Sequence, residues 1–304
     1  MGDVVIDHLR VSVDGWTAVA GPGAEPDRFG CYWDLAEIEG WFGGLAVRAD
    51  SEDRTGADGA HDGQPYFAAR TVTLAGLLDA PDPAALLAAM RRLAGVLAGR
   101  RTGTLVVEEV ATGITRSAEC RLDVQGRAKR TGETSADWEI TVYCPDPLRY
   151  GPPLQDSTGL PKSGGGLAWP LFTNGFLDWG QPGDPGQVIL SNGGTADAPI
   201  LFRATAGPLG LPEGFEISAG GRRLTYAAVV PPRQTIWIDT ATGAVLAEGT
   251  ADRRSELTHA DWLHVPAADP ETGVAGELTI QFTSLGGAYD EGAQLVAQWT
   301  EADT

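Results

Sequence analysis

Short segments of alternating apolar and polar residues, separated by glycine or proline turns, are the feature of this sequence that most constrains its fold. In the second half of the chain they recur at 187–190, 200–204, 215–218, 223–229, 235–239, 244–247, 277–282 and 294–299. A strand that is apolar at every second position buries one face, and many short strands joined by turns are typical of a β-sandwich or jelly roll. The 41 glycines and 20 prolines agree with a turn-rich β protein.

The first half of the chain has the same pattern with one interruption. Strands are expected at 32–38, 45–49, 67–74, 104–110, 115–123 and 138–144, after a hairpin within residues 1–20. Residues 50–65 are polar throughout and predict a long loop. The first half is therefore also predicted to consist mainly of β-strands.

The interruption predicts an amphipathic helix over residues 83–98. Asp82 is a good N-cap and Pro83 fits the first helical turn, while Gly99 favours an end at that point. Apolar side chains recur at helical steps: Leu86, Met90, Leu93 and Leu97.

Two domains are expected. Pro145 and Pro147 interrupt the strand pattern, and residues 151–168 are rich in glycine, proline and serine, as linkers are. We therefore predict a first domain over 1–150, a linker over 151–168 and a second domain over 169–304.

The charge of the chain is strongly acidic but unevenly distributed. It has 41 acidic against 22 basic side chains, a net charge of −19, which disfavours a dedicated nucleic-acid-binding protein. Residues 91–130 are the exception, with nine basic and four acidic side chains. This stretch is either a solvated surface or a contact between copies of the chain, in which basic residues meet acidic ones. The candidates for that contact are Arg91, Arg92, Arg100 and Arg101 on the basic side and Asp53, Asp58 and Asp62 on the acidic side.

Motifs of catalysis are missing from the sequence. It has no G-x-S-x-G elbow, no phosphate-binding loop and no H-E-x-x-H pair, and its three cysteines have no C-x-x-C spacing. We expect no enzyme activity, no catalytic residue, no cofactor and no metal site. The absence of long apolar runs predicts no membrane span, and the first residues do not resemble an ordinary signal peptide.

Two weaker binding hypotheses stay open. The acidic residues of the polar loop offer oxygen ligands for calcium, although their order does not match an EF-hand. Trp169 and Trp179 flank a segment rich in glycine and proline, and exposed aromatic side chains on a β-sandwich can stack on sugar rings.

Several short motifs, in order, resemble those of the distal tail (Dit-like) proteins of long-tailed siphophages, often described as minor tail proteins in phages of actinobacteria. Residues 70–76 (RTVTLAG) are similar to the family's R-x-I-x-L-x-G strand, which follows the loop 56–63 (GADGAHDG). Residues 146–151 (DPLRYG) are similar to its D-P-x-x-Y run. In the second half, residues 190–199 (LSNGGTADAP) and 237–243 (WIDTATG) are similar to its N-x-G-x-x-x-A-x-P and I-D-T-x-x-G segments.

The resemblance implies a structural protein of the virion. It implies a first domain that forms the ring and is a β-sandwich with one helix, related in fold to tail-tube proteins. The second domain would be an outward β-sandwich that is galectin-like or like a carbohydrate-binding module. Six copies would form a ring at the tail tip, made in the host cytoplasm. The ring would join the tail tube protein to the tail-tip hub and serve as a platform for receptor-binding proteins, with no contact to nucleic acid or membrane required. The alternatives are a carbohydrate-binding protein for host cell-wall glycan and, less well supported, a glycan hydrolase.

Overall fold

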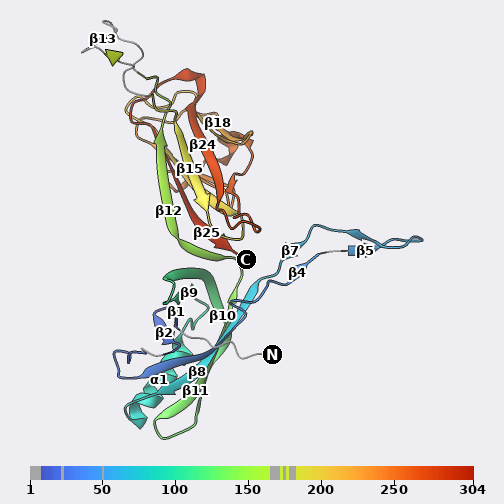
Figure 1. Cartoon of the computed structure of the whole chain (residues 1–304), viewed down its shortest axis with the longest axis vertical. Coiled ribbons are helices and arrows are strands. Elements are labelled where there is room, and N and C mark those ends of the chain that lie inside the picture. The colour runs from blue at the N-terminus through green and yellow to red at the C-terminus, as the bar shows by residue number, and fades with distance from the viewer. Residues whose placement is uncertain (1–7, 22–23, 50, 165–171, 174–175, 178–182) are drawn as a thin grey trace. The chain divides into compact units, whose positions relative to one another are not determined.

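The protein is described by a computed structural model that covers residues 8–21, 24–49, 51–164, 172–173, 176–177 and 183–304 (Figure 1). The chain divides into two compact units, the first with residues 1–151 and Thr304, the second with residues 152–303. The predicted fold class is confirmed, because strands dominate both units and the described residues form a single α-helix. No described helix has the length and apolar character needed to cross a membrane.

The sheet of unit 1 closes on itself. Its strands follow the order β11–β8–β3–β2–β1–β9–β10, and β10 also pairs with β11, so the ladder returns to its first strand. Every pairing is antiparallel except the short parallel contact between β2 and β3. The strands are β1 (Leu9–Val13), β2 (Trp16–Val19), β3 (Tyr32–Glu39), β8 (Arg70–Asp79), β9 (Thr102–Glu109), β10 (Ile114–Arg130) and β11 (Ser135–Cys144). A closed ladder has few unpaired edges, and it makes the core of this unit barrel-like.

Strand β10 makes the closure possible. It is 17 residues long; its first half, up to Arg121, pairs with β9, and its second half, from Arg121 to Arg130, pairs with β11. The register with β11 shifts twice, between Leu122 and Val124 and again before Arg127. Because such bulges bend a strand and increase its twist, β10 can leave one partner and join the other.

Three tryptophans fill the barrel. Trp16, Trp33 and Trp138 are buried and meet edge to face, with ring centroids 4.9–6.2 Å apart. The indole N–H of Trp138 donates a hydrogen bond of 3.0 Å to the backbone oxygen of Leu77. Edge-to-face aromatic packing adds to the hydrophobic burial that holds this core together.

Helix α1 (Pro83–Gly95) begins as the sequence predicts. The carboxylate of Asp82 accepts a hydrogen bond of 2.8 Å from the backbone N–H of Ala85, and Pro83 occupies the first turn. The helix buries Leu86, Ala89 and Leu93. The prediction placed the end of the helix at residue 98, but the helix ends at Gly95. Leu97 has a φ of 51°, which lies outside the α-helical region.

The helix lies close against β10. A Cβ atom on Gly126 would lie 2.9 Å from the backbone oxygen of Leu93, so only glycine allows this approach. Next to it, the Gln125 side chain donates a hydrogen bond of 3.1 Å to the backbone oxygen of Ala94. The bent part of β10 is therefore also the surface on which the helix docks.

A narrow hairpin leaves the barrel between β3 and β8, and we call residues 44–69 the arm. It contains two short ladders, β4 (Val47–Arg48) with β7 (Tyr66–Phe67), and β5 (Ser51–Asp53) with β6 (Ala60–Asp62) (Figure 1). All ten residues of these strands are exposed. The sequence predicted a strand at 45–49 followed by a loop at 50–65, which is wrong in part: both segments belong to one solvated hairpin. Its backbone is satisfied by pairing within the hairpin, so it needs no apolar face.

The three cysteines all lie in unit 1. Cys31, Cys120 and Cys144 are free thiols, each with no exposed surface. Burial raises the pKa of Cys120 to about 12 and that of Cys144 to about 11, and it also raises the pKa of Cys31. The thiolate is the reactive form of cysteine. Because the raised pKa values keep these side chains protonated, they are unreactive in the folded barrel.

Unit 2 contains two sheets that bury alternate side chains between them. The first follows the order β12–β25–β16–β19–β20–β21, with β23 beside β16, and the second follows β15–β24–β17–β18–β22. Strands of the first sheet are β12 (Arg149–Gly159), β16 (Ala198–Thr205), β19 (Thr235–Asp239), β20 (Ala244–Ala247), β21 (Ala251–Asp252), β23 (His264–Val265) and β25 (Gln294–Asp303). Strands of the second are β15 (Gln187–Asn192), β17 (Phe215–Ala219), β18 (Arg222–Tyr226), β22 (Leu257–Ala260) and β24 (Gly276–Ser284). This is the predicted sandwich, and β25 pairs with β16 inside the unit.

Some short elements complete the chain. A two-stranded ladder joins β13 (Phe172–Thr173) and β14 (Phe176–Leu177), and two 3-10 turns, η1 (Arg254–Glu256) and η2 (Leu285–Gly287), lie in unit 2. The stretch 151–168 was predicted to be a linker, but its first part, through Gly159, continues strand β12. Its last residues, from 165 on, lie outside the described residues. The domain roles assigned from the sequence stay predictions.

Buried Asn192 explains one of the motifs in the second half. Its side-chain N–H donates to the backbone oxygens of Ala196 at 2.7 Å and Pro266 at 3.2 Å, and its oxygen accepts from the N–H of Gly194 at 2.9 Å. A buried amide is tolerated only when both its donors and its acceptor are satisfied. The asparagine therefore fixes the turn from which the chain enters β16.

Gly76 is the position in unit 1 where a side chain would do most harm. A Cβ atom there would lie 1.9 Å from the backbone oxygen of Asp34 and 2.9 Å from the ring of Trp138. We expect Gly76→Ala to lower the free energy of unfolding by about 3 kcal/mol or more, because the strand pair must separate to admit the methyl group. Urea denaturation measures this change.

The matched control is Gly95→Ala at the end of α1. A Cβ atom on Gly95 meets nothing within 4 Å, so this variant is expected to be as stable as the wild type or slightly more stable. Equal stabilities of the two variants would contradict the close strand approach at Gly76.

Candidate functional site

A hollow of about 740 Å³ opens on unit 1 beside the end of α1. Strands β1 and β2 contribute the turn Asp14–Gly15 and Trp16, the segment before β3 contributes Asp27 to Phe29, and the helix contributes Arg92. Arg101 lies at its rim. Aromatic, acidic and basic side chains therefore share one recess, which we call the arginine hollow.

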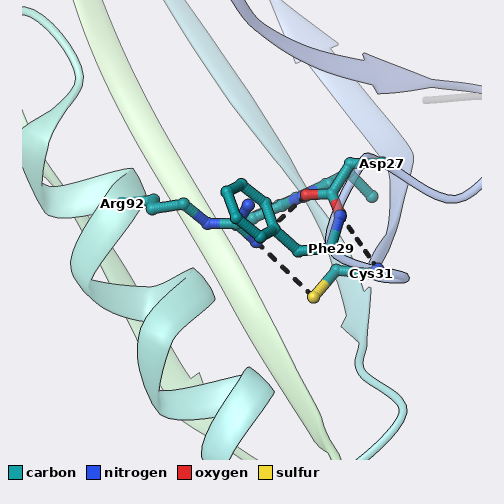
Figure 2. Close-up of polar contacts among 5 residues, drawn as sticks. Asp27, Phe29, Cys31 and Arg92 are labelled. Atoms are coloured by element: carbon teal, nitrogen blue, oxygen red, sulfur yellow. Dashed lines mark hydrogen bonds and ion pairs between the residues drawn. The ribbon is translucent and has the colours of Figure 1, made fainter.

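Asp27 organises one wall of the arginine hollow. One carboxylate oxygen accepts from the backbone N–H groups of Phe29 at 2.8 Å and Cys31 at 3.0 Å. The other forms an ion pair of 3.0 Å with Arg92 (Figure 2). It also accepts a hydrogen bond of 3.1 Å from the indole N–H of Trp33. The carboxylate thus joins the segment before β3, the tryptophan core and the helix.

This network changes the acidity of Asp27. Burial alone would raise the pKa of its carboxyl group, but the hydrogen bonds from Cys31, Trp33 and Phe29 and the charge of Arg92 together outweigh that effect. The pKa therefore lies below its ordinary value of 3.8.

Arg92 is only partly satisfied by these contacts. Its guanidinium lies over the ring of Phe29, 3.9 Å from the centroid (Figure 2). The guanidinium of a second arginine, Arg28, lies 4.8 Å from the centroid of the same ring. Its Nη2 also approaches the sulfur of Cys31 at 3.5 Å, while its Nε is buried without a hydrogen-bond acceptor. Phe29 itself is 49% exposed. An exposed aromatic ring beside arginines is a composition typical of interaction hot spots.

Only two of the four arginines predicted for a subunit contact line the hollow. Arg92 and Arg101 do so, and Arg101 forms an ion pair of 3.3 Å with Asp14 across the recess. Arg91 and Arg100 are exposed but lie outside the hollow. The structure thus divides the basic cluster into a pair that lines the recess and a pair that is simply solvated.

The predicted acidic residues gather on the arm. Asp53 and Asp62 lie on β5 and β6, and Asp58 lies in the turn that joins them. Each is exposed, and no hydrogen bond or ion pair joins its side chain to another described residue. Val47, Tyr66 and Phe67 near the root of the arm are also exposed, at 60%, 55% and 47%. The arm therefore presents acidic and apolar side chains that its own unit does not cover.

Arg70 fixes the root of the arm to the barrel. It is only 3% exposed, and its Nη1 donates to the backbone oxygens of Gly40 and Trp41, each at 2.8 Å. Its Nε donates to the backbone oxygen of Pro147 at 3.0 Å. Burial and the neighbouring Arg149 lower its pKa. The guanidinium belongs to the first residue after the arm. It thus ties the segment before the arm to the segment that follows β11.

The sequence motif around residues 146–150 belongs to the same region. The Asp146 carboxylate accepts from the backbone N–H of Leu148 at 3.0 Å and from the hydroxyl of Tyr150 at 2.6 Å. Arg149 donates to the backbone oxygen of Trp41 at 3.2 Å and lies over the ring of that tryptophan. The motif therefore shapes the place where the chain leaves β11.

The other hypotheses have different outcomes. Trp169 and Trp179, the candidates for glycan stacking, lie outside the described residues. Within the described ranges, no three histidine, cysteine or carboxylate side chains come together in a way that could hold a metal ion. His259 forms an ion pair with Asp261 at 2.9 Å, as a histidine in an ordinary surface hydrogen bond does.

Comparison with known proteins supports the fold. No protein family and no curated protein matches the chain. Its fold is similar to that of the SPP1 Dit (gp 19.1) protein, described as a paradigm of the hub adsorption apparatus in phages that infect Gram-positive bacteria, with a TM-score of 0.63 and 12% identity over 97% of this chain and 98% of that one. A chain of the phage P2 baseplate in its activated conformation with Ca also matches, with a TM-score of 0.44 and 10% identity over 95% and 97% of the two chains.

The resemblance to distal tail proteins that the sequence motifs suggested is therefore confirmed at the level of the fold. The likeness runs through both units, since nearly the whole of each chain is covered. The galectin-like character of unit 2 and an origin in actinobacterial phages stay predictions.

Sequence reasoning missed Asp27, Phe29 and Arg70 as parts of this site. Asp27 is followed by the sequence Arg-Phe-Gly before Cys31, which gives no periodic signal. Arg70 stood inside a recognised motif, but only the fold shows that it binds the carbonyl groups of the arm root. The sequence offered one signal for this role of Arg70, namely the glycine-rich segment 40–44 that precedes it in the chain.

The lowered pKa of Asp27 predicts an acid-dependent loss of stability. Its folded pKa lies below the unfolded value, so its contribution is complete above about pH 4 and is lost as the pH falls through the folded pKa. We expect Asp27→Asn to be less stable than the wild type at pH 7 and to lose less stability between pH 7 and pH 3. The free energy of unfolding in urea at several pH values measures both effects.

The control for this experiment is Asp58→Asn on the arm, whose carboxyl group has no described partner and should leave the pH curve of the wild type unchanged. If Asp27→Asn follows the same curve as the wild type, the carboxylate does not stabilise the wall of the hollow.

Arg70 predicts a second change in stability. A lysine cannot span the four carbonyl groups that the guanidinium reaches, so Arg70→Lys leaves buried acceptors unpaired and is expected to cost about 3 kcal/mol. The exposed Arg48→Lys on the arm is the matched control and should change stability by less than about 0.5 kcal/mol. Urea denaturation compares the two, and equal effects would exclude the clamping role of Arg70.

Proposed function

We propose that this chain is a structural virion protein of a long-tailed phage, which forms a hexameric ring at the distal end of the tail tube. The observation that carries the proposal is the similarity of fold to the SPP1 Dit protein along both units. The name of that protein places it in a hub adsorption apparatus, and we extend that role to this chain. The ring joins the tail tube protein to the tail-tip hub and carries receptor-binding proteins.

The surfaces of unit 1 support self-association of the ring type. The arm and the arginine hollow are different surfaces with charge of opposite sign: the arm has five acidic residues and two arginines, whereas three arginines and two aspartates line the hollow. When the arm of one copy enters the hollow of the next, the contact is heterologous, and a heterologous contact that closes produces a ring. Phe29 in the hollow and the exposed aromatic residues of the arm add apolar area to this contact.

The proposal accounts for several features without an active site. Within the described residues, no histidine, cysteine or carboxylate side chains gather into a cluster that could hold a metal ion, and the thiols are buried. A structural protein needs stable units and complementary surfaces, and the chain supplies both. We therefore assign it to the virion, at the tail tip.

Charge reversal tests the contact between copies. In the purified full chain, the paired changes Arg92→Glu and Arg101→Glu should weaken the ring strongly, as should Asp53→Lys, Asp58→Lys and Asp62→Lys on the arm. When both sets are combined in one chain, the attraction is restored with reversed sign and rings should return. Mass measurement by light scattering and negative-stain electron microscopy detect rings, and added salt should weaken them.

The matched control is Arg91→Glu with Arg100→Glu, which makes the same change in net charge outside the hollow. It should leave ring formation near that of the wild type. Because Arg92→Glu also breaks the pair with Asp27, the single change Arg101→Glu gives a second test, which breaks only the more exposed pair with Asp14. A wild-type chain that is monomeric at every concentration, and absent from purified virions, would exclude the proposal.

A further inference from the structure

The outward face of the second sheet in unit 2 carries a row of polar side chains that crosses four strands. The register places Gln187 on β15 opposite Gln281 on β24, Gln281 opposite Ser218 on β17, and Ser218 opposite Arg223 on β18. Directly paired residues have Cβ atoms about 5 Å apart, so this row is a continuous line of amide, hydroxyl and guanidinium groups.

A second polar row lies beside the first. It runs from Thr283 on β24 through Glu216 on β17 and Thr225 on β18 to His259 on β22. We call the two rows together the polar face. It differs from the arginine hollow in that no single charge and no aromatic side chain dominates it.

The polar face is recessed at its centre. A hollow of about 480 Å³ is lined by Gln187, Glu216, Ser218, Arg223 and Gln281 together with the turn at Gly220 and Gly221. A Cβ atom on either glycine would meet nothing within 4 Å, so this turn forms a low, open rim. The recess is therefore open to a chain that lies across the strands.

Several of these side chains are already held in place. Gln281 donates to the backbone oxygen of Pro185 at 2.8 Å, and its own oxygen accepts from the Gln187 amide at 2.8 Å. One oxygen of Glu216 accepts from the hydroxyl of Thr225 at 3.0 Å. Side chains that are fixed before binding lose little conformational entropy when a ligand arrives, which favours affinity.

Other groups on the same face have unused hydrogen-bonding capacity. Among the described residues, the hydroxyl of Ser218, the guanidinium of Arg223 and the second oxygen of Glu216 have no hydrogen-bond partner. Donors and acceptors thus alternate within one recess. Two residues beyond Gln187 on β15, Ile189 is 58% exposed and offers apolar surface on the same side of the sheet.

We propose that the polar face of unit 2 binds a polyhydroxylated ligand, namely a stretch of glycan chain laid across strands β15, β24, β17 and β18. Sugar hydroxyl groups both donate and accept hydrogen bonds, which matches the alternation of amide, hydroxyl, carboxylate and guanidinium groups here. The C–H face of a sugar ring matches Ile189. A lipid surface would need an apolar patch, and a nucleic acid would need a strongly basic one.

This inference does not depend on the ring proposal or on Trp169 and Trp179. The polar face belongs to unit 2, whereas the arm and the arginine hollow belong to unit 1. Ring formation can therefore succeed or fail without any effect on glycan binding by the polar face.

The test is binding of the purified full chain to a printed array of bacterial surface polysaccharides, including neutral polysaccharides and polyol-phosphate polymers. Affinity for each glycan that gives a signal is then measured by biolayer interferometry. Arg223→Ala removes a donor and Ser218→Gln fills the recess, and each is expected to weaken binding by about tenfold or more. Both side chains point outward, so neither change disturbs the buried core.

Two matched variants outside the polar face serve as controls. Arg233→Ala removes an exposed arginine from a turn of the same unit, and Ser255→Gln enlarges an exposed serine in η1. Both should bind as the wild type does. Failure of the wild type to bind any glycan, or binding that survives both polar-face changes, would overturn the proposal. Binding to polyol-phosphate polymers alone, if it depended on Arg223 but not on Ser218, would also overturn it, because phosphate and not the hydroxylated chain would then be the ligand.

Discussion

The sharing of β10 between two partners is the constraint on which the rest of unit 1 depends. One strand must pair with β9 over its first half and with β11 over its second, and its two register shifts allow it to turn from one to the other. The same bent region receives helix α1, because Gly126 admits the backbone of Leu93. Since the helix ends beside the arginine hollow and supplies Arg92 to it, the position of the site follows from how the barrel closes.

The arm and the arginine hollow are the two surfaces that we propose meet between neighbouring copies. Arg70 ties the root of the arm to the barrel with hydrogen bonds to backbone oxygens, so the acidic residues further out are displayed at a fixed place. In the hollow, Asp27 satisfies part of Arg92 and leaves its Nε buried without an acceptor. A buried polar group without a partner is costly.

Much of the fold could be predicted from the sequence because its signals are local. The cap at Asp82, the helical steps of Leu86 and Leu93, and the alternation in β16 or β17 each act within a few residues. The closure of the barrel could not be predicted, since it depends on which strands pair across long separations. The arm was missed for a related reason: a hairpin with polar side chains on both faces has no periodicity that distinguishes it from a loop.

The candidate site shows the same division. Charge counting identified the basic stretch and the acidic residues opposite it, because composition is visible in the sequence. It could not separate Arg92 and Arg101, which line the hollow, from Arg91 and Arg100, which do not, because that depends on where the helix ends and how the following turn is folded. Arg70 binds backbone groups that are distant in the sequence, and Asp27 lies in a segment with no recognisable motif. Only the fold therefore assigns their roles.

The placement of the three thiols has a consequence for how the molecule can be followed in solution. All of them lie inside the barrel of unit 1, and unit 2 contains no cysteine. Since burial keeps them as unreactive thiols, an alkylating reagent can label them only after the barrel has opened. The rate at which the thiols are alkylated therefore reports the opening of unit 1 alone. Unit 2 does not contribute to this signal, and no engineered probe is needed.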